Sequence, residues 1–148
     1  MIDLAQVGKV VARRAFRSLK LAQDLDIWKD ARSLCRVVFA VTSKGLFCRD
    51  YRFKDQIRAS SGSIMDNIAE GFERGGNKEF IQFLAIAEGP CGETRSQAYR
   101  AFDFKYIKQE DLREILDRTM SLSKRISGFI SYLKKSTYKG SKYANPKP

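Results

Sequence analysis

The 148-residue sequence contains no histidine. Because imidazole is the side chain that most readily exchanges a proton near neutral pH, this absence excludes Ser-His and Cys-His nucleophile pairs and imidazole acid–base catalysis. It also excludes the Glu-x-x-His motif with which helix bundles bind di-metal centres. Carboxylate and Ser-Lys chemistry remain open, but no residue spacing favours them. We therefore expect a protein that is not an enzyme and that has no metal and no cofactor.

Cysteines are few, and long hydrophobic runs are absent. Cys35, Cys48 and Cys91 are odd in number and widely spaced, which favours neither a disulfide framework nor a zinc site. No stretch approaches the roughly 20 apolar residues of a membrane span, and the basic N-terminus lacks the apolar segment of a secretory signal. We expect a cytoplasmic protein with reduced thiols, two of them small core residues, and no membrane partner.

The net charge of +11 is unevenly distributed along the chain. Residues 1–20 hold five basic residues against one acid, and residues 124–148 hold seven basic residues and no acid. Residues 21–123 hold sixteen of each sign and sum to zero, although residues 29–58 within them hold eight basic against three acidic residues. The basicity therefore belongs mainly to the two ends, with a smaller excess early in the balanced middle.

Four segments show the apolar spacing of amphipathic helices, and none shows sustained strand-like alternation. They cover residues 24–42, 51–74, 78–103 and 109–135. Their short connections predict an all-α, antiparallel up-down four-helix bundle over residues 24–136. A basic N-terminal extension (1–23) and a basic disordered tail (137–148) would flank it.

One apolar stripe on each segment should form the core of the bundle. The stripes comprise Ile27, Ala31, Leu34, Val38 and Val41; Ile57, Ser61, Ile64, Ile68 and Phe72; Phe80, Phe83, Leu84 and Ala87; and Ile115, Leu122, Ile126, Phe129 and Leu133.

Several residues should mark the ends of these helices. Asp24 or Asp26 can cap the first and Asn77 the third, since their side chains accept backbone N–H bonds. A glycine in "RGGN" should end the second helix, and "SKGLFCRDYR" should form a loop. Pro90 removes a hydrogen bond inside the third helix and should bend or break it near Gly89.

The second helix also carries a polar face beside its apolar stripe. We interpret this face, together with two polar residues of the third helix, as a packed polar seam between helices or between subunits. The alternative is a catalytic carboxylate at Glu70, but no second carboxylate or nucleophile lies in a convincing relation to it. The seam residues are Asn67, Glu70, Arg74, Glu93 and Gln97, with Ser60 and Ser63 on the same face.

A basic cluster with interleaved aromatic residues precedes that face. Cations neutralise phosphates and exposed rings stack on unpaired bases, so the cluster is a candidate nucleic-acid-binding site. The alternative is a solvated loop whose aromatic side chains plug one end of the bundle. The candidate binding residues are Arg49, Arg52, Lys54 and Arg58, beside Lys44 and the rings of Phe47, Tyr51 and Phe53.

The segments "LDIWKDARSL" and "QIRASSGSIMDNIAEGFERGGNKEFIQFLAIAEG" resemble the four-helix-bundle proteins encoded in intervening sequences of bacterial 23S rRNA genes. The resemblance covers residues 25–135. The same fold is similar to that of the accessory protein of diversity-generating retroelements, a barrel-like homopentamer that binds nucleic acid and its reverse transcriptase. Here Pro90 stands where the family usually has Ser, and Thr94 where it has Leu.

The resemblance implies a ring-like homo-oligomer, a pentamer, with no established enzymatic activity. It also implies that Asn67, Glu70, Phe80, Glu93 and Gln97 are architectural positions. The leading hypothesis is an oligomeric bundle that binds nucleic acid, as structured RNA or a nucleic acid–protein complex, through its basic surfaces. The alternative is a scaffold that docks a protein such as a reverse transcriptase or another polymerase.

Overall fold

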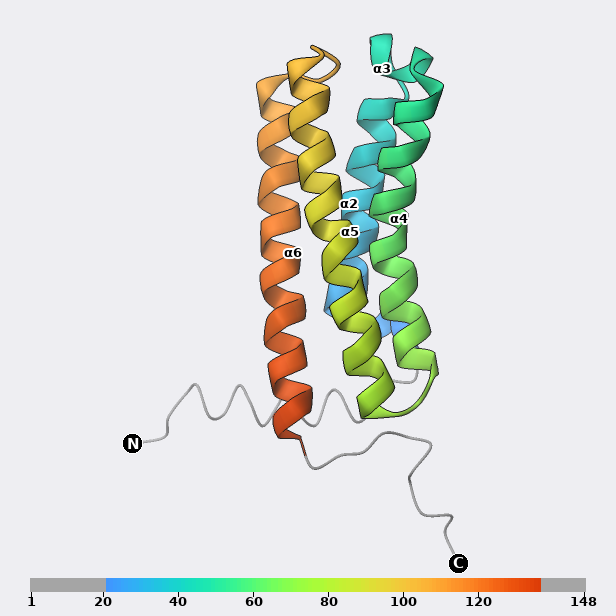
Figure 1. Cartoon of the computed structure of the whole chain (residues 1–148), viewed down its shortest axis with the longest axis vertical. Coiled ribbons are helices and arrows are strands. Elements are labelled where there is room, and N and C mark those ends of the chain that lie inside the picture. The colour runs from blue at the N-terminus through green and yellow to red at the C-terminus, as the bar shows by residue number, and fades with distance from the viewer. Residues whose placement is uncertain (1–20, 137–148) are drawn as a thin grey trace, which may run out of the picture.

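The computed structural model describes residues 21–136, and within them the chain is all-helical with no strand (Figure 1). Four long helices lie side by side as a helical bundle, with two short helices at its ends. In chain order the elements are η1 (Ala22–Asp24), α2 (Asp26–Thr42), α3 (Gly45–Arg49), α4 (Tyr51–Glu73), α5 (Asn77–Asp103) and α6 (Gln109–Lys135).

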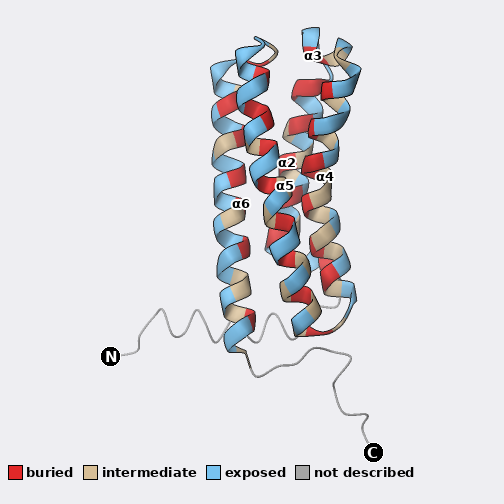
Figure 2. Ribbon diagram, viewed as in Figure 1, coloured by how far each residue is buried: buried red, intermediate tan, exposed pale blue. Residues whose placement is uncertain are grey.

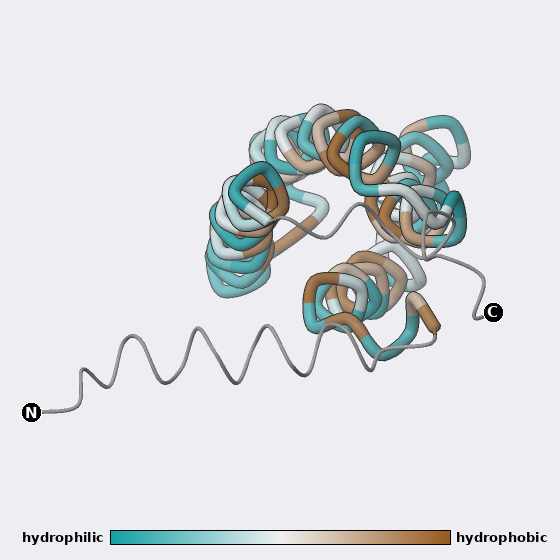
Figure 3. Tube along the Cα trace, turned by 90° about the horizontal axis from the view of Figure 1, so that it is seen from below, coloured by the Kyte–Doolittle hydropathy of each residue, from teal (hydrophilic) through white to brown (hydrophobic). Residues whose placement is uncertain are grey.

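Each long helix packs on two neighbours. α4 lies between α2 and α5, and α6 contacts both α5 and α2, so the four helices surround one core. The view along the bundle shows this arrangement, with hydrophobic positions turned inward (Figure 3). None of the helices in residues 21–136 combines the length and apolarity needed to cross a bilayer.

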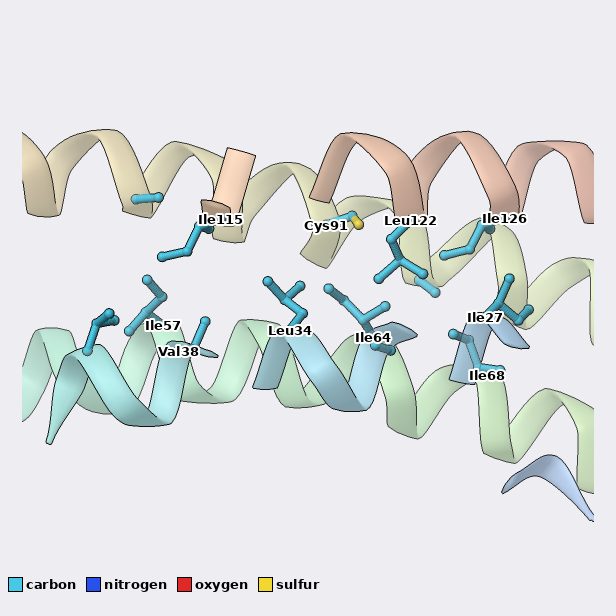
Figure 4. Packing of buried hydrophobic residues seen from close by; sticks show 14 of the residues in the cluster. Ile27, Leu34, Val38, Ile57, Ile64, Ile68, Cys91, Ile115, Leu122 and Ile126 are labelled. Carbon is cyan, nitrogen blue, oxygen red and sulfur yellow. The ribbon is translucent and has the colours of Figure 1, made fainter. Parts of the chain in front are cut away.

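The predicted apolar stripes form the core (Figure 2). Every predicted residue of the α2 stripe is buried, and Leu34, Ile64, Ile115 and Ile126 are completely inaccessible. Figure 4 shows these side chains meeting between the helices. Phe72, Phe83 and Phe129 are half-buried at the edge of this core. Helical periodicity was sufficient to predict the core because one face of each helix is shielded by its neighbours.

The ends of the helices differ from the predictions by one or two residues. The N-cap of α2 is Leu25, and neither Asp24 nor Asp26 caps that helix with its side chain. Gly76 rather than Asn77 is the N-cap of α5, which begins at Asn77. Gly75 has φ of +77°, so the predicted left-handed glycine after α4 is confirmed.

The predicted loop between the first two helices is wrong in part, because residues 45–49 form the short helix α3. The side chain of Phe47 in α3 is completely buried, and this burial holds the helix against the end of the bundle. Asp50 then caps α4 by accepting a hydrogen bond from the Phe53 backbone N–H at 3.1 Å.

Of the two outcomes predicted near Gly89, a bend or a break, the break does not occur, because α5 runs from Asn77 to Asp103 without interruption. Proline deletes one hydrogen bond, and α5 is packed between α4 and α6 on both sides of Pro90. The Thr94 hydroxyl donates to the Pro90 carbonyl at 2.8 Å, which adds a bond within the same turn. The two departures from the family pattern, Pro90 and Thr94, are therefore in direct contact.

The predicted tail, residues 137–148, and nearly all of the predicted extension, residues 1–23, lie outside the described residues. Of the extension only residues 21–23 are described. Ala22 is buried there, within the short helix that contacts α2 and α4.

Candidate nucleic-acid interface

The candidate interface lies at the end of the bundle where α3, the start of α4 and the turn between α5 and α6 meet (Figure 1). An aromatic cluster holds these segments together. The Phe47 ring lies 5.0 Å from the Phe53 ring and 5.2 Å from the Tyr106 ring. The Tyr106 hydroxyl donates to Asp50 Oδ2 at 2.9 Å, and this bond raises the pKa of Tyr106. Asp50 therefore joins the cap of α4 to the turn before α6.

Two of the predicted binding residues are exposed and available. Arg49 ends α3 and Arg52 lies in the first turn of α4. Neither forms an ion pair or a side-chain hydrogen bond with another residue of the described part. Both guanidinium groups can therefore donate hydrogen bonds to a phosphate without breaking an existing contact.

The other two predicted binding residues already have intramolecular partners. Lys54 Nζ donates to the Cys48 carbonyl at 3.3 Å and lies 4.9 Å from the Tyr51 ring centroid. Arg58 joins α4 to the end of α2 through hydrogen bonds to Thr42 Oγ1 at 2.8 Å and Ser43 Oγ at 3.0 Å. These contacts fix the position of both cations and make Arg58 partly structural.

The aromatic residues of the cluster divide into two kinds. Phe47 and Phe53 are buried, so for these two the plug interpretation is confirmed. Tyr51 is 71% exposed, and Phe104 of the α5–α6 turn is 51% exposed. Sequence reasoning did not identify Phe104, because its proximity to α4, with a 6.0 Å separation from the Phe53 ring, arises only in the folded chain.

The structure brings together one part of the predicted polar seam. Ser60 Oγ of α4 donates to Gln97 Oε1 of α5 at 2.5 Å and lies 2.9 Å from the Thr94 hydroxyl. Gln97 Nε2 donates to Glu93 Oε1 at 3.3 Å. Ser60, Thr94 and Gln97 are all buried, so this network fixes how α4 and α5 pack.

The other seam residues remain on α4. Asn67 Nδ2 donates to the Ser63 carbonyl at 2.7 Å, and Glu70 pairs with Arg74 at 2.8 Å within the same helix. Glu70 and Arg74 are about half-exposed, at 53% and 56% for their side chains. Arg74 reaches α5 only through its guanidinium group, 5.3 Å from the Phe83 ring.

An open groove of about 670 Å³ runs between α4 and α5 beside the buried network. Small side chains line it, including Ala59, Ser63 and Ser96, while Glu93 and Arg100 place opposite charges along it. Small residues allow another backbone to approach closely, so this groove can accommodate a helix or an extended segment.

Two of the thiols, Cys35 and Cys91, have surroundings that disfavour the reactive thiolate. Cys91 is fully buried, and burial raises its pKa to about 11. Burial is also the main cause of the raised pKa of Cys35, which is half-buried against Met65. Among residues 21–136 no group of three Cys, Asp or Glu side chains is arranged to hold a metal ion.

Sequence reasoning missed a second basic surface, on α2. Lys29, Arg32 and Arg36 are all exposed and lie opposite the buried Leu34 and Val38. Their spacing of three and four residues repeats at the helical period, and this is the signal that could have identified them.

The comparisons with known proteins agree with the resemblance in the sequence. A protein of unknown function from the S23 ribosomal protein family of Bacteroides thetaiotaomicron has a similar structure, with 21% sequence identity and a TM-score of 0.63. The similarity covers 71% of this chain and 95% of that chain, and at this identity it shows the fold alone. No curated protein matches the sequence. The family model for 23S rRNA-intervening sequence proteins matches residues 23–128, and the chain belongs to that family.

Proposed function

We propose that this protein is a non-enzymatic helical bundle that binds nucleic acid, as structured RNA or a nucleic acid–protein complex, through the basic end of the bundle. The exposed and unengaged guanidinium groups of Arg49 and Arg52 carry the proposal. Lys54 and Arg58, held by their own contacts, add fixed positive charge beside them. Contacts of this kind go to phosphates, which gives affinity with little sequence preference.

Non-enzymatic function is supported by the composition and by the surroundings of Glu70. The chain has no histidine, and the Glu70 carboxylate is paired with Arg74 on an exposed helix face rather than held in a cleft. A general base needs a reacting group within hydrogen-bond reach, and the partner of Glu70 is a guanidinium group.

The oligomeric part of the proposal is an antiparallel up-down bundle that assembles into a ring-like homo-oligomer, a pentamer. It is supported by the short connections between consecutive helices and by the open groove between α4 and α5. Multi-angle light scattering of the full chain tests it. A monomer at the concentrations used for binding would refute it.

The proposed binding is tested by measuring the affinity of the full chain for an RNA hairpin and a DNA duplex over a salt series. Each phosphate contact contributes about 0.9 to the slope of log K against log salt on a duplex. Arg49→Gln/Arg52→Gln should therefore lower this slope by about 1.8 while the helical circular dichroism stays unchanged. Binding that is insensitive to salt would refute the proposal.

A protein scaffold that docks a reverse transcriptase or another polymerase is the second candidate function. Ile86, Tyr99 and Phe102 favour it, because these large apolar side chains are exposed on α5. This alternative predicts tight association with one protein and negligible binding to bare nucleic acid. The same salt series, repeated with a purified polymerase in place of the RNA, distinguishes the two functions.

A further inference from the structure

The outward face of α2 carries only positive charge. Lys29, Arg32 and Arg36 project from one side of the helix and span about 10 Å along its axis, at 1.5 Å per residue. The acids of α2 lie elsewhere: both Asp26 and Asp30 are turned toward α6, where they pair with Arg125. The three cations are therefore not neutralised by acids of their own helix.

The first half of α6 and most of α4 do not share this arrangement. On the first half of α6 the exposed cations Arg113 and Arg118 are interleaved with Glu110, Glu114 and Asp117 along one surface. The second half of α6 carries the exposed Lys124, Lys134 and Lys135 and no acid, so positive charge also gathers there. On α4 the outward face beyond the first turn, which holds Arg52, is acidic instead. Asp55, Asp66 and Glu73 are exposed there, and spacings of eleven and seven residues place them on one side of the helix. A polyanion would therefore be attracted along α2 and repelled from the outer side of α4 beyond its first turn.

The aromatic rings beside this face are already paired with cations. The Arg32 guanidinium lies 5.8 Å from the Trp28 ring centroid, and the Arg58 guanidinium lies 4.4 Å from that of Phe39. Such pairs hold the guanidinium groups in place and occupy ring faces on which a base would stack. The face therefore presents ordered charge for phosphates.

From this arrangement we propose that the outward face of α2 is a second nucleic-acid site, which binds the phosphodiester backbone of a base-paired stem. The inference rests on the proposed nucleic-acid function and extends it from the bundle end along α2. A helix fixes its cations in a rigid row, and a paired stem fixes its phosphates in the same way. Neither partner then needs further ordering, whereas a single strand must lose conformational freedom to bind.

The test uses the full-length protein and fluorescence anisotropy with two probes, a paired RNA hairpin and a non-pairing RNA strand of the same length. The double variant Arg32→Gln/Arg36→Gln removes two charges from α2. Its matched control, Lys78→Gln/Arg113→Gln, removes two exposed charges from α5 and α6. Both variants have the same net charge, so a difference between them reports position.

Raising salt from about 50 to about 200 mM should lower the affinity for the hairpin in both proteins. The fold-loss of affinity should be about ten times smaller for the α2 double variant than for the wild type, because the variant has lost two phosphate contacts. Adding Lys29→Gln should increase that difference to about 40-fold. The control should retain the wild-type salt dependence. Arg32→Lys/Arg36→Lys keeps the charges and should restore hairpin binding, which separates loss of charge from loss of fold.

Equal salt dependence of the α2 variant and the wild type would overturn the inference while leaving the bundle-end site intact. An equal reduction of the salt dependence in the α2 variant and in the control would also overturn the inference, because net charge alone would then explain binding. Equally tight binding of the non-pairing strand through the same α2 residues would exclude the paired stem as the preferred ligand. Wild-type protein that binds neither probe would refute the proposed function itself.

Discussion

The close contact between α4 and α5 at Gly71 offers a sharp test of the packing. Gly71 lies on the buried face of α4, and a Cβ added there would sit 2.5 Å from the Phe83 Cβ and 3.0 Å from the Phe80 Cδ2. The Phe83 Cβ is fixed to the α5 backbone, so it cannot rotate away. Gly71→Ala therefore requires the two helices to separate.

The expected change in the free energy of unfolding on Gly71→Ala follows from two opposing effects. Replacing a helix-interior glycine by alanine ordinarily stabilises a helix by about 1 kcal/mol. Overpacking a well-packed contact costs about 1–3 kcal/mol, and a Cβ contact this short belongs at the upper end of that range. We expect Gly71→Ala to lower the free energy of unfolding by about 2 kcal/mol. At roughly 2–4 °C per kcal/mol, Tm should fall by about 4–8 °C.

Gly62→Ala is the matched control on the same helix, because a Cβ at residue 62 meets no atom within 4 Å. It should raise the free energy of unfolding by up to about 1 kcal/mol. Both are measured by urea and thermal unfolding, followed by circular dichroism at one fixed protein concentration, since assembly would make Tm concentration-dependent. A Gly71→Ala protein that melts at or above the wild-type temperature would refute the close approach of α4 and α5.

Three further predictions address the bundle end, the core thiol and the buried network. The hydrogen bond to Asp50 raises the pKa of Tyr106, so stability linked to this phenol is present below the ordinary tyrosine pKa of about 10 and is lost as pH rises through the higher folded value. In ultraviolet titration Tyr106→Phe should remove the late-titrating phenol. Cys91, with its pKa raised to about 11, should resist iodoacetamide in the folded protein at pH 8 and react once urea unfolds it, as mass spectrometry can follow. Ser60→Ala leaves Gln97 Oε1 without its buried donor and should cost about 1–3 kcal/mol in urea unfolding, whereas no loss would contradict that hydrogen bond.

The helices and the core could be predicted because each helix buries one apolar face, and the spacing of that face is a property of the sequence alone. The exact ends of the helices could not be predicted, because capping depends on the backbone geometry around each candidate residue. Asp50 caps α4, whereas Asp24 and Asp26, which have the same side chain, do not cap α2. Sequence alone also left open whether Pro90 bends or breaks α5, and the helix is not broken because it packs against neighbours on both sides.

The candidate site was predicted only in part, for a related reason. Phe47 and Tyr51 are both aromatic residues within one basic stretch, yet the first is buried and the second is 71% exposed. The Phe47 ring packs against Tyr106, a residue far along the chain, and this contact is not visible in the local sequence. Arg58 likewise finds its hydrogen-bond partners at the end of α2. Local sequence shows which residues can bind phosphate, and only tertiary contacts show which are free to do so.

The charge of the bundle illustrates the same dependence on tertiary structure. Residues 21–123 hold sixteen acids and sixteen basic residues, so their sum predicts no attraction for a polyanion. The fold separates the two signs, because the acids of α2 face Arg125 while Lys29, Arg32 and Arg36 face outward. At about 0.1 M salt, charges more than about 10 Å apart are largely screened from one another. Asp26 and Asp30 lie within that distance of Lys29, but both are paired with Arg125. A phosphate beside α2 therefore experiences mainly the three unpaired cations, and a bundle whose charges sum to zero can present a basic face.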